Sequence, residues 1–144
     1  MKLIYIFTLL ICALVWTPYG NAAQSPGRKA RVVAVGGQIE QAYKSRKSNI
    51  QVEGEGIVIR ILADDLSGSR HQRFIVRLPS GQTLLIAHNV DLALRVASLR
   101  KGDTVRFYGE YEWSKKGGTV HWTHHDPKGR HVAGWLKHKG RIYQ

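Results

Sequence analysis

After residue 50, apolar and polar positions alternate with a period of two, which is the pattern of half-buried β-strands. The expected strands are 51–62, 70–78, 82–88, 104–113 and 119–124. In the first of them one face carries three isoleucines, Ile57, Ile59 and Ile61. Its other face carries Val58 and Arg60. Because Gly, Pro, Asp and Ser concentrate between these segments, we expect short turns that join consecutive strands.

The spacing of apolar residues predicts two short helices. In residues 37–47, Ile39, Ala42 and Tyr43 recur at helical intervals beside a basic face. Residues 89–99 begin with an Asn that can cap a helix and place apolar residues at helical spacing. Residues 125–144 contain Pro and several Gly, and we expect them to form an ordered, irregular tail against the strands.

Three strands, a helix and two strands within about 75 residues is the element order of the OB-fold, a five-stranded Greek-key barrel. SH3-like barrels and other small β domains produce similar patterns. We therefore predict a mainly β chain: a small OB-like barrel with one or two short helices. In this prediction residues 24–49 form an N-terminal arm with a short helix, and residues 50–144 form the barrel with a histidine-rich tail.

The first 23 residues have the character of a cleavable signal peptide. Lys2 precedes the apolar stretch 3–16, which is shorter than the roughly 20 residues that a membrane-spanning helix needs. Small residues follow, with cleavage expected after Ala22 or Ala23. We expect a periplasmic or secreted protein without stable membrane insertion after cleavage. The only cysteine, Cys12, would leave with the signal, which excludes cysteine chemistry in the mature protein.

The charge is strongly positive, with 22 Lys and Arg against 10 Asp and Glu, a formal net charge of +12. A field of this sign favours polyanions, most of all nucleic acid. Basic residues on the predicted strands provide candidate charge contacts: Arg60, Arg70, Arg73, Arg77 and Arg106. Aromatic residues nearby provide candidate stacking surfaces: Tyr108, Tyr111, Trp113 and Trp122. Our leading hypothesis is an exported OB-like domain that binds nucleic acid or another polyanion in this way.

Histidine is concentrated near the C-terminus. Five imidazoles within 18 residues are candidate ligands of a divalent ion such as zinc: His121, His124, His125, His131 and His138. Their spacing matches no established zinc motif.

The alternative hypothesis is a metal-dependent hydrolase of the nuclease or phosphodiesterase type. Its candidate catalytic residues are His121, His125, Asp126 and His131, with one His as general base. In this scheme Arg70 or Arg73 would stabilise developing charge. A third hypothesis is an interaction module of the cell envelope, in which the histidines only hydrogen-bond the tail to the barrel and stack on Trp122 and Trp135.

Four segments, 70–76, 84–93, 102–113 and above all HWTHHDPKGRHVAGWLKHKGRIYQ (121–144), resemble a family of small exported bacterial proteins known as domain of unknown function 3465. The resemblance covers about residues 50–144 and implies an OB-like barrel and export. It also implies that the histidine segment is the functional signature of the family. The family carries no assigned activity, so the resemblance leaves the three functional hypotheses open.

Overall fold

The computed structural model describes residues 37–144, so the predicted signal peptide and the first half of the predicted N-terminal arm lie outside the described residues. A helix spans 37–44 and is followed by seven strands: β1 (Ile50–Ile61), β2 (His71–Arg77), β3 (Thr83–Asn89), β4 (Thr104–Glu112), β5 (Thr119–His121), β6 (Trp135–His138) and β7 (Arg141–Tyr143). Among residues 37–144, no helix is long and apolar enough to cross a membrane.

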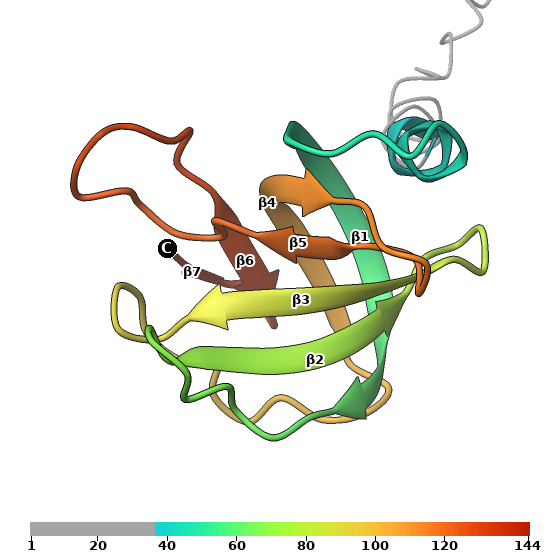
Figure 1. The fold of residues 1–144 in the computed structure, drawn as a ribbon. Coiled ribbons are helices and arrows are strands. Elements are labelled where there is room, and N and C mark those ends of the chain that lie inside the picture. The colour runs from blue at the N-terminus through green and yellow to red at the C-terminus, as the bar shows by residue number, and fades with distance from the viewer. Residues whose placement is uncertain (1–36) are drawn as a thin grey trace, which may run out of the picture.

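Five of the strands close into a barrel, which confirms the predicted architecture (Figure 1). The strand order is β1-β2-β3-β5-β4, and β4 pairs again with β1 to complete the ring. The β3–β5 pairing is parallel, and the other pairings of the barrel are antiparallel. This is the connectivity of an OB-like Greek-key barrel, in which closure leaves none of the five strands with an open edge.

The inward faces of β2, β3 and β4 follow the period-two pattern. Phe74 and Val76 on β2, Leu84 and Ile86 on β3, and Phe107 on β4 are fully buried. The helix closes one end of the core with Ile39, which is also fully buried. The predicted helix in 37–47 is therefore confirmed, and so is the predicted apolar face of β2.

The isoleucine face of β1 points outward, which the alternation in this strand did not indicate. Val58 is fully buried, whereas Ile57 and Ile61 are each 45% exposed. The inward face instead carries Gly54 and Gly56 between valines, because the core leaves no room for larger side chains there. A Cβ on Gly54 would overlap the Phe107 ring, at 2.8 Å from Cε2. A bulge between Val58 and Arg60 then shifts the register against β2.

The helix predicted in 89–99 does not form, and the segment contains two separate turns instead, at 90–92 and 97–98. The reason is that side chains of the barrel take its backbone groups. Gln72 accepts a hydrogen bond from the N–H of Val96 at 2.9 Å and donates one to its carbonyl at 3.2 Å. His88 lies 3.1 Å from the carbonyl of Leu94. Competition of this kind overrides helical spacing of apolar residues.

The C-terminal residues are more regular than predicted. Strand β5 ends at His121 rather than 124, and residues 122–134 form a loop. Residues 135–143 then form the β6–β7 hairpin rather than an irregular tail. Strand β6 pairs with β4 beside β5, so both strands share one edge of β4. The loop that joins β5 to β6 projects from the side of the barrel (Figure 1).

Candidate functional site

Three ligand-type side chains meet on the outer face of β4 and β5. Glu110 and Glu112 are two residues apart and point to the same side of β4, and Glu110 is the direct cross-strand partner of His121. His121 Nε2 lies 3.7 Å from Glu110 Oε1 and 4.0 Å from Glu112 Oε1. We call these three residues the Glu–His cluster. Each residue offers one possible ligand atom, a carboxylate oxygen or an imidazole nitrogen, and these three atoms lie within 4.8 Å of one another.

The environment of the cluster is partly buried and acidic. Burial lowers the pKa of His121 below its usual range, although the two neighbouring glutamates act in the opposite direction. His121 Nε2 is buried and has no hydrogen-bond partner among the described residues. Gln51, which faces Glu110 from the other side on β1, also has a buried Nε2 without a partner there. Both unpartnered nitrogens therefore belong to residues that pair with Glu110 across a strand, His121 on β5 and Gln51 on β1.

A stacked pair of rings covers one side of the cluster. Trp122 and His131 lie face to face, with 3.7 Å between ring centroids and 13° between planes. Trp122 adopts a left-handed backbone conformation, φ 50°, which ends β5 and starts the loop. His131 Nδ1 lies 3.8 Å from Glu110 Oε2. The carboxylate of Glu110 thus lies between His121 and His131.

Asp126 organises the loop that carries His131. Its carboxylate accepts backbone hydrogen bonds from Lys128 at 2.9 Å, Arg130 at 2.7 Å and His131 at 3.0 Å. The bond from Lys128 contributes most to lowering the pKa of Asp126 below its usual value. Asp126 therefore acts on His131 through the backbone, and its oxygens are already occupied.

We expect Asp126→Ala to release this loop without unfolding the barrel, because only loop N–H groups lose their acceptor. Hydrogen exchange measured by NMR should accelerate at the amides of 128, 130 and 131 and stay slow at Phe107. Asp64→Ala, which removes a carboxylate paired with Arg95 instead, is the matched control. Unchanged exchange at all three loop amides would contradict the role given to Asp126.

The structure separates the other predicted metal ligands. His124 is buried, and its Nδ1 donates to the carbonyl of His125 at 2.6 Å. The side chain of His125 is exposed. His138 is buried at the far end of β4, where its Nε2 lies 2.8 Å from Asp103 Oδ2. His121 and His131 therefore lie together beside Glu110, and the remaining three histidines lie elsewhere.

Most of the predicted arginine contacts are in ion pairs. Arg70 bonds Asp91 at 2.6 Å, Arg73 lies 3.7 Å from Asp65, and Arg106 bonds Glu53 at 2.8 Å. Arg60 and Arg77 are exposed and form no ion pair within residues 37–144. The predicted aromatic set is also divided. Tyr111 is in the core, Tyr108 stacks on Trp135, and Trp113 and Trp122 flank opposite ends of β5.

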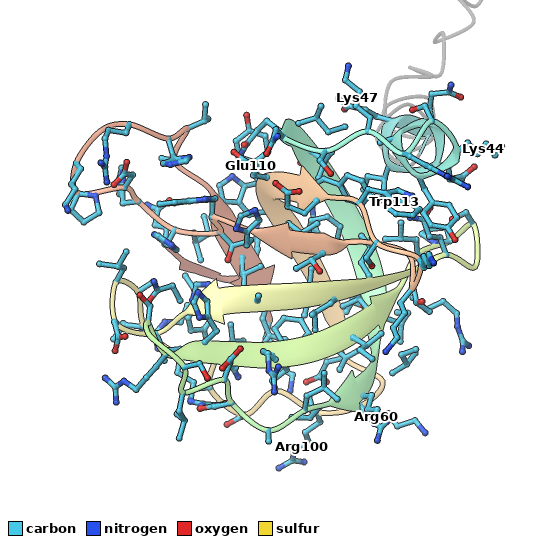
Figure 2. All side chains as sticks on the ribbon, viewed as in Figure 1. Lys44, Lys47, Arg60, Arg100, Glu110 and Trp113 are labelled. Atoms are coloured by element: carbon cyan, nitrogen blue, oxygen red, sulfur yellow. The ribbon has the colours of Figure 1, made fainter. Side chains whose placement is uncertain are left out.

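A different basic surface forms where the helix meets the β4–β5 turn. A groove of about 390 Å³ is lined by Tyr43, Lys44, Arg46, Trp113 and Lys115, and we call it the basic–aromatic groove. No acidic side chain lines it among the described residues. Figure 2 shows Trp113 beside the helix end with Lys44 and Lys47, whereas Arg60 and Arg100 lie at the opposite end of the barrel.

Hydrogen bonds hold the two sides of this groove together. Trp113 Nε1 donates to the carbonyl of Tyr43 at 3.1 Å, and the Trp113 N–H donates to Ser48 Oγ at 2.9 Å. Gln82 donates to the carbonyl of Gly117 at 2.8 Å and fixes the turn to the barrel. The groove is therefore built before any ligand binds, which reduces the entropic cost of binding.

Arg46 occupies the position after the helix that most often contains glycine. The N–H of Lys47 bonds the carbonyl of Ala42 at 2.9 Å and that of Arg46 bonds Tyr43 at 3.2 Å, which together form a Schellman motif. Arg46 has φ 51°, a left-handed conformation that favours glycine. Its guanidinium lies over the Trp113 ring, 5.5 Å from the centroid.

The sequence contains signals for both sites beyond the predicted site residues. Glu110 and Glu112 form an i, i+2 pair on a predicted strand, directly before the turn that brings the chain back to His121. For the groove, the signals were the basic residues at the helix end and the two lysines of the β4–β5 turn. The Glu–His cluster forms when β4 and β5 pair across one turn, and the groove forms where the helix packs against that turn.

Comparison with known proteins identifies the family. No curated protein matches the chain. The chain does match the family model described as protein of unknown function (DUF3465), over residues 26–144. This match covers most of the sequence and both sites described above, and it confirms the resemblance first seen in the C-terminal histidine segment. The chain therefore belongs to the DUF3465 family of proteins of unknown function.

Proposed function

We propose that this protein is an exported polyanion-binding module, and that single-stranded nucleic acid is its most suitable ligand. The observation that carries the proposal is the basic–aromatic groove, which combines three cationic side chains with two aromatic rings and has no acidic lining residue among residues 37–144. Single-stranded nucleic acid binds to such surfaces through ion pairs with phosphates and stacking of bases on rings.

The position of the groove on the barrel supports the proposal. OB-like barrels bind oligonucleotides and oligosaccharides with the face of strands 2 and 3 and with the β1–β2 and β4–β5 loops. Here the β4–β5 turn contributes Trp113 and Lys115 to the groove, and Lys116 follows directly. The proposal keeps the ligand class expected from the net charge but moves the contacts from the strand arginines to this turn and the helix end.

Arg46 supports the proposal independently. An arginine in the left-handed position after a helix makes the protein less stable than a glycine would. The contact of Arg46 with Trp113 offsets part of this loss. A binding role explains a charged residue at this position. Arg46→Gly should therefore fold with a stability within about 1 kcal/mol of the unchanged protein and still bind polyanions several-fold more weakly.

The experiment measures binding of a fluorescent oligothymidylate by anisotropy at several salt concentrations. With three phosphate contacts, log K should fall with log salt with a slope of about −2, at roughly −0.7 per contact on a single strand. Lys115→Gln should weaken binding several-fold and reduce the steepness of this slope by about 0.7.

Arg60→Gln is the matched control, because it removes one exposed positive charge at the opposite end of the barrel (Figure 2). It should leave affinity and slope almost unchanged. Equal losses in Lys115→Gln and Arg60→Gln would show that net charge rather than the groove governs binding. Binding that is undetectable or independent of salt, for the oligonucleotide and for heparin alike, would overturn the proposal. Binding of heparin alone would replace nucleic acid with an acidic glycan as the ligand.

A further inference from the structure

We infer that the Glu–His cluster, Glu110, Glu112 and His121, is a binding site for a first-row divalent cation such as Zn²⁺. The inference is independent of the basic–aromatic groove, which is formed by other residues, those of the helix end and the β4–β5 turn. It also differs from the metal site expected from the sequence, because two of its three ligands are glutamates and four of the five candidate histidines are not among them.

The spacing of the ligand atoms suits such an ion. Zinc binds imidazole nitrogen and carboxylate oxygen at about 2.0–2.2 Å, which places neighbouring ligand atoms roughly 3.4 Å apart in a tetrahedral site. His121 Nε2 is 3.7 Å and 4.0 Å from the two nearest carboxylate oxygens. Small side-chain rotations would bring all three atoms to the required distance. All three side chains project from two paired strands, so the backbone that positions them is fixed.

The two glutamates of the cluster have no lysine or arginine partner among the described residues, and a bound cation would neutralise their charge. Elsewhere in the described chain, Glu53, Asp64, Asp91 and Asp103 each form an ion pair with an arginine or a lysine. Glu110 and Glu112 form no such pair within residues 37–144, although the protein is strongly basic. Their charge partners there are His121 and, for Glu110, also His131.

The buried nitrogen of His121 is the second, independent observation. A buried polar atom without a partner costs free energy unless an ion or water satisfies it. His121 Nε2 is such an atom, and it points to the carboxylates at close to ligand distance. A divalent cation would accept its lone pair and neutralise both glutamates at once.

The ligand set indicates the kind of ion and site. One imidazole and two carboxylates are hard-to-borderline donors, which suit Zn²⁺, Mn²⁺ or Fe²⁺ better than Cu⁺. Three protein ligands leave at least one coordination position for water or a ligand, as in catalytic rather than structural zinc sites. The Trp122–His131 pair lies beside the cluster, with His131 contacting the second oxygen of Glu110. His131 is thus a positioning residue for Glu110.

The test uses the full mature chain without a histidine tag, stripped with chelator and titrated with Zn²⁺ by calorimetry. We expect one ion per chain, and we expect Co²⁺ to give the visible absorption of a site with mixed nitrogen and oxygen ligands. Glu112→Gln should weaken Zn²⁺ binding at least 10-fold, and His121→Gln should weaken it at least as much. Both side chains are on the outer face, and circular dichroism will check that the barrel is retained.

His125→Ala is the control, because it removes an exposed histidine of the same segment. It should leave the affinity for Zn²⁺ within two-fold. Failure of the unchanged protein to bind one Zn²⁺, or a loss of binding in His125→Ala rather than in His121→Gln, would overturn the inference. Lys115→Gln should leave Zn²⁺ binding unaffected, so that failure of the groove and failure of the cluster are distinguished.

Discussion

His88 should make the protein about 3 kcal/mol less stable at pH 4 than above pH 6.5. The side chain is fully buried, and its burial lowers the pKa to about 4, against 6.5 for a free imidazole. Between these values the unfolded chain binds a proton that the folded chain does not. The free energy of unfolding must therefore fall as the pH falls through this window. A difference of about 2.5 pKa units corresponds to roughly 3 kcal/mol.

Burial favours the neutral form of His88, and its two hydrogen bonds offset only part of this effect. Its Nε2 faces the carbonyl of Leu94 at 3.1 Å, so this nitrogen carries the proton and donates. Its Nδ1 is then an acceptor for the hydroxyl of Thr123 at 2.9 Å. Protonation would place a second donor and a charge in a buried position. Through its contacts with Leu94 and Thr123, the same imidazole holds residues 89–99 and the start of the loop 122–134 against the barrel.

Urea unfolding of the protein and of His88→Gln, measured from pH 4 to pH 7.5, checks this prediction. The glutamine variant will be less stable at neutral pH, so the comparison concerns the change of stability with pH and not its absolute value. The variant should lose most of the dependence between pH 4 and 6.5, apart from a smaller contribution of the same sign from His121. Parallel curves for the two proteins would contradict the assignment.

Phe107→Ala should cost about 3–5 kcal/mol, the largest effect of any single substitution we predict. Phe107 is fully buried on β4, and its ring fills the space above Gly54 on the paired strand β1. Removing the ring loses its burial and leaves a cavity at the centre of the barrel. Because single domains are stable by only about 5–15 kcal/mol, this change should be readily visible in urea unfolding.

A double-mutant cycle tests whether Phe107 and Gly54 are complementary. Gly54→Ala alone should cost about 1–3 kcal/mol, because its Cβ would overlap the ring and approach Ile39 Cδ1 at 3.1 Å. In the Phe107→Ala background the same change should cost at least 1 kcal/mol less. Gly37→Ala, where a Cβ would meet nothing within 4 Å, should be nearly neutral. Additive losses at 54 and 107 would contradict the packing argument.

The strands could be predicted because their signals are local. Alternation in 70–78, 82–88 and 104–113, separated by turns rich in Gly, Pro and Asp, gave the positions of β2, β3 and β4 and the buried face of β2. The same local reasoning did not show that the isoleucines of β1 lie on the outer face. Which of its two faces is buried depends on Phe107 and Val76, and these residues approach Gly54 and Gly56 from other strands. A bulge that depends on pairing with β2 has no clear signal in β1 alone.

The helix predicted in 89–99 was wrong for a similar reason, because contacts with other strands decide the structure of this segment. Its spacing was helical, but Gln72 and His88 belong to strands and bind the backbone of Val96 and Leu94. Such competition depends on contacts between residues up to 24 positions apart. Tertiary hydrogen bonds therefore overrode a preference that would apply to the isolated segment.

For the candidate sites, the sequence predicted which types of residue take part but not which of them lie close together. The sequence indicated that histidine, arginine and aromatic rings would provide the chemistry, and His121, His131 and Trp113 do lie in the two sites. It did not show that Asp126 would be occupied by three backbone N–H groups or that His138 would pair with Asp103.

The amino-acid sequence by itself determined a basic chain of the DUF3465 family, its β-strand pattern and its OB-like order of elements. These properties depend on composition and on neighbours a few residues apart. Only the tertiary structure decided that Glu110, Glu112 and His121 form one cluster and that Arg46, Trp113 and Lys115 line one groove. The register between β4 and β5 brings the cluster together, and packing of the helix against the β4–β5 turn forms the groove. Neither register nor packing is specified by local spacing.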